Sequence, residues 1–503
     1  MGETDAGAPP LMATGIAGLD DVLGGGFTAD RLYLVEGSPG SGKTTLALQC
    51  LLEGVRLGEK GLYVTLSETT AELAAVAASH GWTLAGITVL ELVAPESELE
   101  PDNQNAMFQP AEVELGATTK TILDAVDRLK PTRVIIDSLS EMRLLAQNPL
   151  RYRRQVLALK QYFIGRECTV FLLDDLTSET DDLQLQSIAH GVVSLEQLSP
   201  EYGAERRRVR VNKLRGRKYR GGYHDFVIER GGLGVFPRLV AGEHLFGQKR
   251  GLLKSDNAEL DALLGGGLQY GTSAVLIGPA GSGKSTLAIQ YARAAAARGE
   301  RTVVFAFDER LETLLERTDG LGMSITPFLD SGHIAVTPVD TAELSPGEFA
   351  HLVRRAAEGD AGRPGAKVIV IDSLNGYLNA MPEEKFLHAQ LHELLTYLGH
   401  KGVVTFLLVA QHGLIGQMDT PVDPTYLADT VVLFRYFEAL GEVRQAISVV
   451  KKRSGKHERT IRELSLGANG IVVGPPLRDF HGVFSGTPSY RGPDRAITGS
   501  KDD

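Results

Sequence analysis

The feature of this chain that most restricts its fold is a glycine-rich loop that occurs twice. The first copy, which begins at Val35, reads VEGSPGSGKTTLALQ, and the second, which begins at Leu276, reads LIGPAGSGKSTLAIQ. Both fit the pattern G-x-x-x-x-G-K-[ST], in which glycines let backbone N–H groups turn inward around an anion. Each loop follows an apolar run and precedes a helix-like run, so we interpret both as phosphate-binding loops.

The similarity between the two halves continues along the chain. GLYVTLSE corresponds to RTVVFAFDE, TRVIIDSLS to KVIVIDSLN, and the basic segment VRVNKLRGRKYRGG to ISVVKKRSGKHERT. Short apolar runs alternate with helix-length segments, which predicts an α/β fold with mainly parallel central sheets and flanking helices. The central strands are almost continuously apolar, as expected when both faces of a sheet are covered. We therefore expect two copies of one domain, at residues 1–240 and 241–475, followed by a C-terminal loop and flexible tail at 476–503.

The overall composition excludes several classes of protein. The chain has 503 residues, 43% hydrophobic and 23% charged, with a formal net charge of −11. This charge argues against coating of nucleic acid through a general basic surface, although a local basic strip is compatible with it. The N-terminus lacks the features of a signal peptide, and the apolar runs are far shorter than the ~20 residues of a membrane span. We expect a cytoplasmic protein without membrane contact, in which Cys50 and Cys168 are buried thiols.

The phosphate loops assign specific roles to their residues. Lys43 and Lys284 should reach the β- and γ-phosphates of ATP, while Thr44 and Ser285 should place a hydroxyl on Mg²⁺. The positive end of the following helix adds to the attraction for phosphate. The predicted nucleotide-binding residues of the two loops are Ser38, Pro39, Gly40, Ser41, Gly42, Lys43, Thr44 and Thr45, and Pro279, Ala280, Gly281, Ser282, Gly283, Lys284, Ser285 and Thr286.

Acidic residues follow two of the predicted strands in each copy. Asp137 and Asp372 end apolar strands, where a carboxylate can hold Mg²⁺ through water. The alternative is that this position caps the start of the following helix, which Ser138 or Ser373 could do equally well. Glu68 in the first copy, and Asp308 with Glu309 in the second, are candidates for the base that orients or deprotonates an attacking water. The alternative for these three residues is an ordinary polar cap at a strand end.

These motifs together resemble the KaiC family, a branch of the RecA/DnaB-like ATPases. The segments that carry the resemblance are the two loops, TGIAGLDDVLGGG, YVTLSET, IIDSLS, NKLRGRKY and FSGTPSY, which cover roughly residues 11 to 490. The resemblance implies tandem RecA-like P-loop domains that assemble into a homohexamer, with ATP bound at each subunit interface. It also implies that the first copy is an ATPase, that the second phosphorylates and dephosphorylates itself, and that a KaiB-like protein is a partner.

The resemblance gives the basic segments a role. In the family, such hairpins reach the nucleotide of the neighbouring subunit, where their cations stabilise charge on the γ-phosphate. The alternative is a solvated hairpin at a sheet edge, where Lys and Arg discourage aggregation. Ser79 and Leu321 match family positions beside the nucleotide base, although a helix-surface serine and a core leucine are the ordinary interpretations. The hairpin residues concerned are Lys213, Leu214, Arg215, Arg217 and Tyr219, and Lys451, Lys452, Arg453 and His457.

Two positions depart from the family pattern. Where the family has adjacent carboxylates, the first copy has Ser67 before Glu68, so hydrolysis there depends on Glu68 or is slow. In the second copy the acceptor pair falls on Thr425 and Tyr426, of which Thr425 keeps an aliphatic hydroxyl; Thr420 is a nearby alternative. We expect autophosphorylation at Thr425, with an unmodified loop threonine as the alternative.

Two other functions remain open at this point. One is a DNA-dependent ATPase of the RecA type. Its candidate contacts are Arg143, Arg151, Arg153 and Arg154 and the basic run AERRRVRVNKLRGRKYR, and the acidic overall charge argues against it. The other is a scaffold that binds ATP to hold a ring together but hydrolyses little, which Ser67 favours for the first copy. Our expectation is a regulatory, clock-like ATPase and autokinase, and the sequence leaves open whether it takes part in an oscillator.

Overall fold

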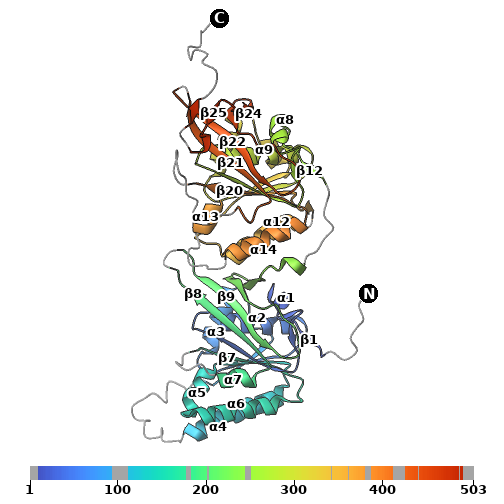
Figure 1. Cartoon of the computed structure of the whole chain (residues 1–503). Helices are drawn as coiled ribbons and strands as arrows, with labels where there is room; N and C mark the ends of the chain where they lie inside the picture. Colours follow the sequence, from blue (N-terminus) through green and yellow to red (C-terminus); the bar gives the residue numbers. More distant parts are fainter. Residues whose placement is uncertain are drawn as a thin grey trace, which may run out of the picture. The chain divides into compact units, whose positions relative to one another are not determined.

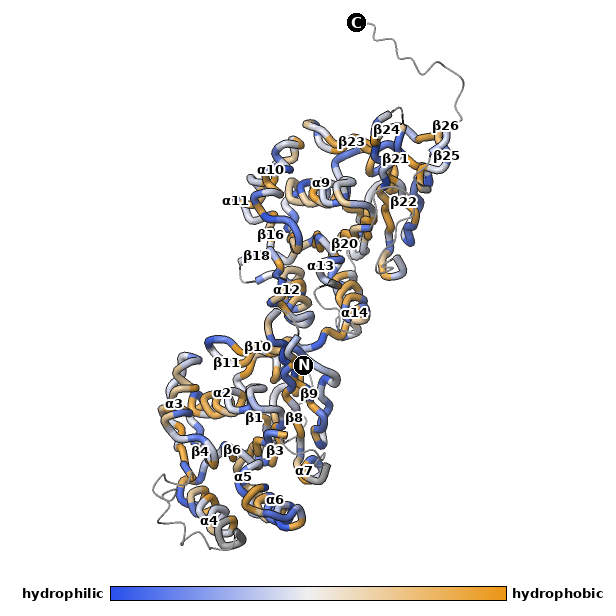
Figure 2. Tube along the Cα trace, turned by 90° about the vertical axis from the view of Figure 1, so that its left-hand side faces the viewer, coloured by the Kyte–Doolittle hydropathy of each residue, from blue (hydrophilic) through white to orange (hydrophobic). Residues whose placement is uncertain are grey.

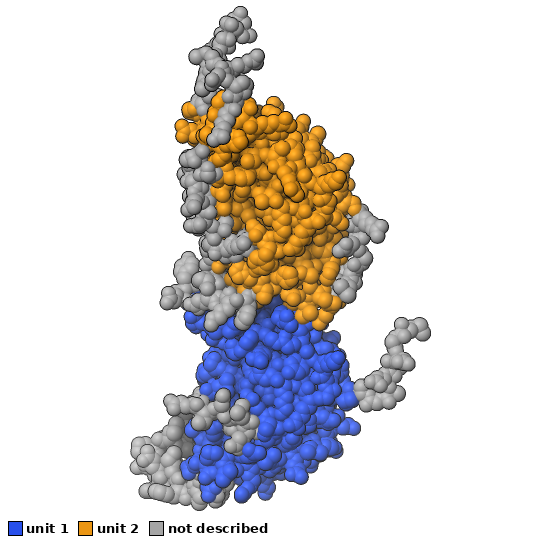
Figure 3. Space-filling model, in the orientation of Figure 1, with its two compact units in different colours: residues 1–238 blue, residues 239–503 orange. Residues whose placement is uncertain are grey.

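The computed structural model divides the chain into two compact units. They span Met1–Arg238 and Leu239–Asp503 (Figures 1 and 3), and we call them the first and second units. The structure describes residues 9–92, 111–176, 183–200, 203–243, 251–340, 342–360, 362–379, 387–411, 425–439, 441–485 and 488–490.

The first unit is built on a nine-stranded sheet with the order β11-β10-β9-β8-β3-β7-β6-β4-β5. Strands β8, β3, β7, β6, β4 and β5 are parallel, and β9 to β11 continue the sheet as antiparallel strands. Their bounds are β3 Leu32–Gly37, β4 Gly61–Thr65, β5 Ile87–Glu91, β6 Arg133–Asp137, β7 Thr169–Asp174, β8 Gly191–Leu198, β9 Arg206–Leu214, β10 Tyr223–Glu229 and β11 Gly232–Phe236. A two-stranded sheet, β1 Leu11–Met12 with β2 Phe27–Thr28, precedes it.

The second unit repeats this plan with the order β16-β15-β19-β20-β14-β21-β22-β23-β24. Strands β16 to β21 in this order are parallel, and β22 to β24 are antiparallel. Their bounds are β14 Ser273–Gly278, β15 Thr302–Ala306, β16 Ile334–Pro338, β19 Val368–Asp372, β20 Val404–Ala410, β21 Thr430–Ala439, β22 Glu442–Lys452, β23 Arg462–Gly467 and β24 Gly470–Pro476. Two-stranded sheets are formed by β12 Leu252–Leu253 with β13 Leu268–Gln269, β17 Gly359–Asp360 with β18 Arg363–Pro364, and β25 Phe480–His481 with β26 Ser489–Tyr490.

Helices cover both faces of each central sheet. The first unit has α1 Leu19–Leu23, α2 Lys43–Arg56, α3 Thr70–Ser79, α4 Ala111–Leu129, α5 Leu139–Ala146, α6 Pro149–Phe163 and α7 Leu183–Ile188. The second has α8 Ala258–Leu263, α9 Lys284–Ala297, α10 Leu311–Gly320, α11 Thr326–Asp330, α12 Pro346–Glu358, α13 Leu374–Asn379 and α14 Leu387–His400. The prediction of tandem α/β domains with mainly parallel sheets and flanking helices is confirmed.

The side chains of the central strands alternate between two hydrophobic layers. On β3, Tyr33 and Val35 pack with α1, α2 and α3, whereas Leu32 and Leu34 pack with α4, α5 and α6. The second unit repeats this division, since alternate residues of β14 pack either with α8 to α10 or with α12 and α14. Figure 2 shows hydrophobic residues in the strands and in the helices of both units. The continuous apolar runs of the sequence therefore correspond to strands covered on both faces.

The basic segments form hairpins inside the sheets. Strand β9 lies between β8 and β10, and β22 lies between β21 and β23. On the outer side, however, the pairing covers only Arg207–Arg210 of β9 and Gln445–Ile447 of β22. Among the described residues, Lys213 pairs only with β8 and Lys451 only with β21. The alternative in which these cations lie at a free stretch of sheet edge therefore stays open beside the predicted role at a neighbouring nucleotide.

Both cysteines are buried, as expected, with Cys50 0% and Cys168 3% exposed. Burial raises the pKa of each thiol to about 12. Among the described residues, no helix combines the length and the apolar character needed to cross a membrane.

Candidate nucleotide sites

The phosphate loops lie where the fold favours anion binding. Each loop follows the central strand β3 or β14 at its carboxyl end and leads directly into α2 or α9. The last glycine of each loop, Gly42 or Gly283, has a φ of 101° or 97° and serves as the N-cap of the helix. Only glycine adopts this conformation without strain, so the sequence pattern and the backbone agree at these positions.

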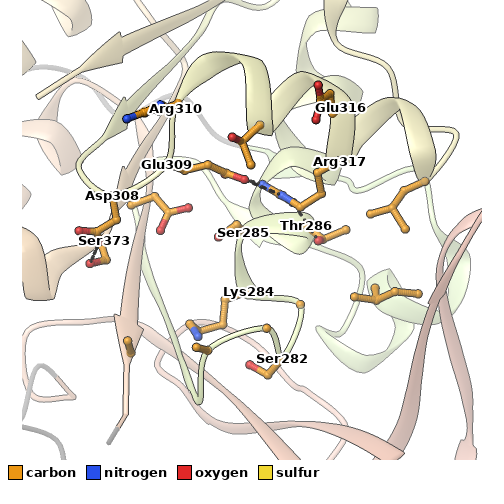
Figure 4. Close-up of a pocket in the computed structure, with 18 of the residues that line it drawn as sticks. Ser282, Lys284, Ser285, Thr286, Asp308, Glu309, Arg310, Glu316, Arg317 and Ser373 are labelled. Carbon is orange, nitrogen blue, oxygen red and sulfur yellow. Dashed lines mark hydrogen bonds and ion pairs between the residues drawn. The ribbon is translucent and has the colours of Figure 1, made fainter.

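The second loop opens into a cavity of about 990 Å³ (Figure 4). Its lining includes the side chains of Asp308, Glu309, Asp372 and Leu321, which were all predicted site residues, together with Arg317, which was not. The loop residues in the lining run from Ala280 to Thr286. The structure thus brings the loop lysine, the three predicted carboxylates, a fourth carboxylate at Glu316 and an apolar residue around one space.

Lys284 is the buried cation of this cavity. Its Nζ donates to the carbonyl oxygens of Gly278 and Pro279 at 2.8 and 2.7 Å. Burial lowers its pKa to about 8, and the nearby Asp372 partly opposes this shift. A phosphate bound beside this desolvated lysine would favour its protonated form, because an opposite charge nearby stabilises the ammonium group.

The strand-end carboxylates of the second unit contact hydroxyl groups. Asp372 accepts a hydrogen bond from Ser285, and its pKa is raised, mainly because it is buried. Asp308 accepts a hydrogen bond from Ser373 Oγ at 2.7 Å. The predicted metal pair, Ser285 and Asp372, is therefore assembled in one place.

The other carboxylate, Glu309, is held by a residue that the sequence analysis missed. Arg317 donates from Nε and Nη2 to the two oxygens of Glu309 at 2.9 and 2.8 Å, and from Nη1 to Thr286 Oγ1 at 3.1 Å. No motif contains this arginine. The available signal was the spacing between the two residues: Arg317 lies about two helical turns after Glu309, which directly precedes the N-cap of α10.

The first unit surrounds its lysine differently. Lys43 Nζ donates to the carbonyls of Gly37 and Ser38 at 2.8 and 2.9 Å, and it also forms an ion pair with Asp175 Oδ1 at 2.9 Å. Burial raises the pKa of Asp175, but its contacts with Lys43 and its hydrogen bonds with Ser138 and Ser140 together outweigh this effect, and the net shift is downward. Asp175 follows β7, the neighbour of β3, and was not among the predicted site residues.

The predicted metal pair of the first unit is also assembled. Thr44 Oγ1 donates to Asp137 Oδ2 at 3.4 Å, and Tyr63 OH donates to the same oxygen at 2.5 Å. Burial is the main cause of the raised pKa of Asp137. The following residue, Ser138, is the N-cap of α5 but makes no side-chain cap hydrogen bond. The contact of Asp137 with Thr44 places its carboxylate at the phosphate loop, and the start of α5 is not capped by a side chain.

Glu68 differs from Glu309 in its surroundings. Its Oε2 is buried and has no hydrogen-bond partner among the residues that the structure describes. Its pKa is raised, first by burial and then by the charges of Asp137, Glu72 and Asp175. A carboxylate with a raised pKa and an unoccupied lone pair has the properties of a general base.

The base-side predictions fare differently in the two units. Leu321 lines the cavity of the second unit. Ser79 is exposed, and its Oγ donates to the carbonyl of Val76 at 2.7 Å, on its own helix. The next residue, His80, has Nδ1 3.0 Å from the Glu229 carbonyl oxygen and Nε2 3.4 Å from Thr45 Oγ1. At this end of the helix, His80 contacts Thr45 at the phosphate loop, whereas the hydroxyl of the predicted Ser79 bonds within its own helix.

In both loops the lysine, the hydroxyl and the strand-end carboxylate fit a nucleoside triphosphate with Mg²⁺. In the first loop, Ser41 is fully buried and its Oγ has no partner among the described residues. A Cβ added to Gly37 would lie 2.5 Å from that same oxygen, so the loop leaves no room for a side chain there. A hydroxyl beside a carboxylate, next to a lysine and a helix N-terminus, matches the chemistry of a metal-bound polyphosphate.

In each unit the basic hairpin contacts the backbone of the segment just before β8 or β21. Lys213 donates to the carbonyls of Gln186 and Ser187, and Arg215 also donates to Ser187. In the second unit, Lys451 donates to the carbonyls of Thr425 and Ala428, and Arg453 to that of Tyr426. The β8–β9 and β21–β22 registers make these contacts equivalent, because Val192 pairs with Lys213 and Val431 with Lys451. The duplicated arrangement places cations against the segment that carries Thr425.

The other predicted hairpin residues have separate contacts. Arg217 donates to the carbonyls of Gly24 and Gly26, Tyr219 to that of Asn212, and Lys452 to those of Leu264 and Gly267. Leu214 packs in the hydrophobic core. The pKa of His457 is lowered by burial and by nearby cations.

The predicted acceptor lies at the margin of what the structure describes. Thr425 is half-buried, and Tyr426 is 56% exposed. The alternative acceptor, Thr420, lies outside the described residues, as does the part of the predicted tail beyond residue 490.

Two α/β units, each with an intact phosphate loop at the carboxyl end of its sheet, define a tandem P-loop nucleotide-binding protein. The family described as "ATPase: KaiC" matches residues 12–240 and again residues 254–478. The chain belongs to this family, and the resemblance predicted from the sequence is confirmed. Family membership implies ATP binding and ATP hydrolysis.

The chain is similar along its length to curated proteins from cyanobacteria. It is 26% identical over 492 residues to the circadian clock protein KaiC3 of Synechocystis, which covers 95% of this chain and 94% of that protein. It is 27% identical over 488 residues to the circadian clock oscillator protein KaiC of Parathermosynechococcus lividus, covering 95% and 88%. The corresponding protein of Synechococcus elongatus is 26% identical, covering 95% and 92%.

Proposed function

We propose that this protein is a hexameric regulatory ATPase that binds Mg-ATP in both units and phosphorylates itself in the second. The observation that carries the proposal is the duplicated cradle. In each unit a buried lysine, a hydroxyl and a strand-end carboxylate meet at a glycine loop (Lys43, Thr44 and Asp137; Lys284, Ser285 and Asp372).

ATP would be held and activated by these residues. The lysines contact the β- and γ-phosphates, and the hydroxyl–carboxylate pairs hold Mg²⁺ directly or through water. When bound, Mg²⁺ supplies charge that stabilises the transferring phosphoryl group. Glu68 in the first unit, and Asp308 with Glu309 in the second, orient the attacking water and take its proton.

Assembly would complete the sites. Lys213 and Lys451 occupy equivalent positions in the two units, since they pair with Val192 of β8 and Val431 of β21. We propose that these hairpins, with Arg215 and Arg453, face the nucleotide of a neighbouring subunit in a homohexamer. Cations supplied in this way stabilise charge on the γ-phosphate, so hydrolysis depends on assembly.

In the second unit, we propose that Thr425 receives the γ-phosphoryl group. The Thr425 oxygen forms a bond to the γ-phosphorus, the bond to the bridging oxygen breaks, ADP leaves, and the hydroxyl proton passes to Asp308 or Glu309. The contact between Lys451 and the Thr425 carbonyl supports this, because it joins the acceptor segment to a hairpin assigned to the interface. A KaiB-like partner follows only from the family resemblance, and a clock-like role only from the names of the relatives.

The proposal is tested by comparing the parent with Lys43→Ala, Lys284→Ala and the double variant. Light scattering after size-exclusion chromatography, with and without Mg-ATP, reports assembly, and phosphate release reports hydrolysis. We expect each single variant to lose one component of turnover and the double variant to lose both. Turnover that is unchanged in the double variant would exclude catalysis at these loops.

The kinase step has its own test. Incubation with ATP followed by mass spectrometry should locate phosphate on Thr425, and Thr425→Ala should abolish it while hydrolysis continues. Labelling of the Thr425→Ala variant at the parent level would remove the site from the proposal.

One observation favours a second candidate for the first unit, in which ATP is bound mainly to hold a ring together. Asp175 places a negative charge on Lys43, where the phosphates would bind, and Ser67 removes one carboxylate. Turnover by the Lys284→Ala variant separates the candidates, because a scaffold would retain ATP without releasing phosphate. A DNA-dependent ATPase is less favoured, since Arg143 already pairs with Asp174 at 2.8 Å.

A further inference from the structure

The second unit contains a cation inside its nucleotide cavity that comes from the same unit. Figure 4 shows the Arg317 side chain pointing toward Glu309, with the guanidinium joined to both carboxylate oxygens. The remaining terminal nitrogen contacts Thr286, the residue that follows the predicted metal ligand Ser285. Arg317 therefore connects the candidate base to the helix that begins at the phosphate loop.

The local structure explains why this contact forms. Arg317 lies in the last turn of α10, and Glu309 lies just before Arg310, the N-cap of that helix. Side chains on a helix lean toward its N-terminus, so a long arginine reaches back along the helix. Both side chains are about three-quarters covered, at 27% and 25% exposed. A bidentate, charge-assisted pair in such a place is stronger than an exposed ion pair.

The pairing has a chemical consequence for hydrolysis. A general base must direct a lone pair toward water and accept its proton. In Glu309, each oxygen already accepts a hydrogen bond from a cation. The other carboxylate of the pair, Asp308, accepts from Ser373. Glu309 is thus held through both of its oxygens, whereas Asp308 accepts its hydrogen bond on Oδ2 alone.

The first unit lacks this restraint. The residue at the position of Arg317 is Val76, since each lies eight residues after the corresponding glutamate. Glu68 Oε2 has no partner among the described residues, and Thr45, the equivalent of Thr286, is contacted by His80. The two units therefore share a glutamate but differ in what holds it.

We infer that Arg317 is a positioning residue that restrains Glu309 and slows water-driven hydrolysis in the second unit, so that ATP persists there for transfer to a hydroxyl acceptor. The inference rests on the proposed function, because it assumes that Glu309 acts on ATP. Thr286 links the restraint to the phosphate loop, so occupancy of the loop and the position of Glu309 are coupled.

The direct test uses Arg317→Gln in the Lys43→Ala background, where phosphate release reports the second unit. We expect kcat to rise at least threefold, with a smaller change in KM for ATP, and Arg317→Lys to return kcat toward the parent value. Arg310→Gln is the matched control. It removes the same charge at the margin of the cavity, but Figure 4 shows this side chain pointing away from Glu309. If Lys43→Ala prevents assembly, Glu68→Gln replaces it as the background.

The reciprocal test introduces the restraint into the first unit. Val76→Arg in the Lys284→Ala background should lower turnover at least threefold, while Val76→Met, a similar increase in volume without charge, should not. This experiment also protects the inference against a folding defect, since it does not alter Arg317.

Glu309→Gln distinguishes failure of the inference from failure of the proposed function. If Glu309→Gln leaves second-unit turnover unchanged, the assignment of the base is wrong. If Glu309→Gln lowers turnover but neither Arg317→Gln raises it nor Val76→Arg lowers it in the first unit, the restraint is overturned and the proposed function stands.

Discussion

The two nucleotide sites of this protein share a backbone and differ in the side chains around it. Both lysines donate to two loop carbonyls over nearly equal distances, and both strand-end aspartates contact the loop hydroxyl. In the first unit, however, Asp175 pairs with the lysine, and Glu68 Oε2 has no hydrogen-bond partner among the described residues. In the second, the described residues include no ion pair to Lys284, and Arg317 holds both oxygens of Glu309. Duplication has therefore preserved phosphate binding while the groups that control it have diverged.

The strand registers allow the divergence to be assigned to positions. Glu36 pairs with Asp174, and its equivalent Ile277 pairs with Val409, so the residue after each pair is Asp175 in the first unit and Ala410 in the second. The two units therefore differ at two equivalent positions, with Asp175 and Val76 in the first unit and Ala410 and Arg317 in the second. On the proposed assignment of Glu68 and Glu309 as bases, the first unit places an acid where phosphate would bind but leaves its base available, whereas the second lacks that acid but restrains its base.

The strongest test of this comparison is the glutamate of the first unit. Glu68→Gln in the Lys284→Ala background should lower turnover by about 100-fold, the effect usual for loss of a general base. Because the pKa of Glu68 is raised, the parent should lose activity as pH falls through a value above that of an ordinary glutamate. A pH–rate profile measures this. Ser67→Ala is the control and should change turnover less than twofold; equal losses in both variants would contradict the assignment.

Asp175 provides the next test. Asp175→Asn should increase the ATP affinity of the first unit about tenfold, because it removes a negative charge from the place where phosphate binds; a charge interaction of about 1.4 kcal/mol corresponds to this factor. Calorimetric titration of the Lys284→Ala variant measures it. The reverse substitution, Ala410→Asp, should weaken ATP binding in the second unit. If Asp175→Asn weakens binding instead, the acid helps to hold the nucleotide and our reading of the difference is wrong.

Lys284 predicts a difference in pH dependence. Its pKa in the free protein is about 8, and only the protonated lysine attracts phosphate. As pH rises through 8 the free site loses its proton, so ATP binding must take one up, and affinity in the Lys43→Ala background should fall about fivefold between pH 8 and 9. Titration in buffers of different ionisation enthalpy detects the proton. Lys284→Arg keeps its charge and should flatten the profile; a parent profile that is already flat would exclude the shift.

The sequence was informative where function depends on contiguous residues. The loops, the strand-end aspartates and the basic hairpins are local motifs, and the structure places them at the carboxyl ends of the sheets or on β9 and β22. Asp175 and Arg317 were missed because their role depends on which strand or helix lies beside the loop. The sequence segment CTVFLLDD predicts a strand ending in acids, but only the pairing of β7 with β3 brings Asp175 to Lys43. Helix packing similarly determines that Arg317 reaches Glu309 and Thr286.

The smallest expected effect concerns the helices that follow the two glutamates. Helix α3 begins with a capping box, in which Thr69 and Glu72 satisfy each other's backbone N–H groups, whereas the N-cap of α10, Arg310, makes no side-chain cap hydrogen bond. Thr69→Ala should therefore destabilise α3 by about 1 kcal/mol, while Arg310→Ala should change α10 by less than half as much. Hydrogen exchange of the first-turn amides measures both. Because Thr69 adjoins Glu68, the loss of order in α3 should also lower first-unit turnover slightly; equal protection in the two helices would show that the cap does not distinguish them.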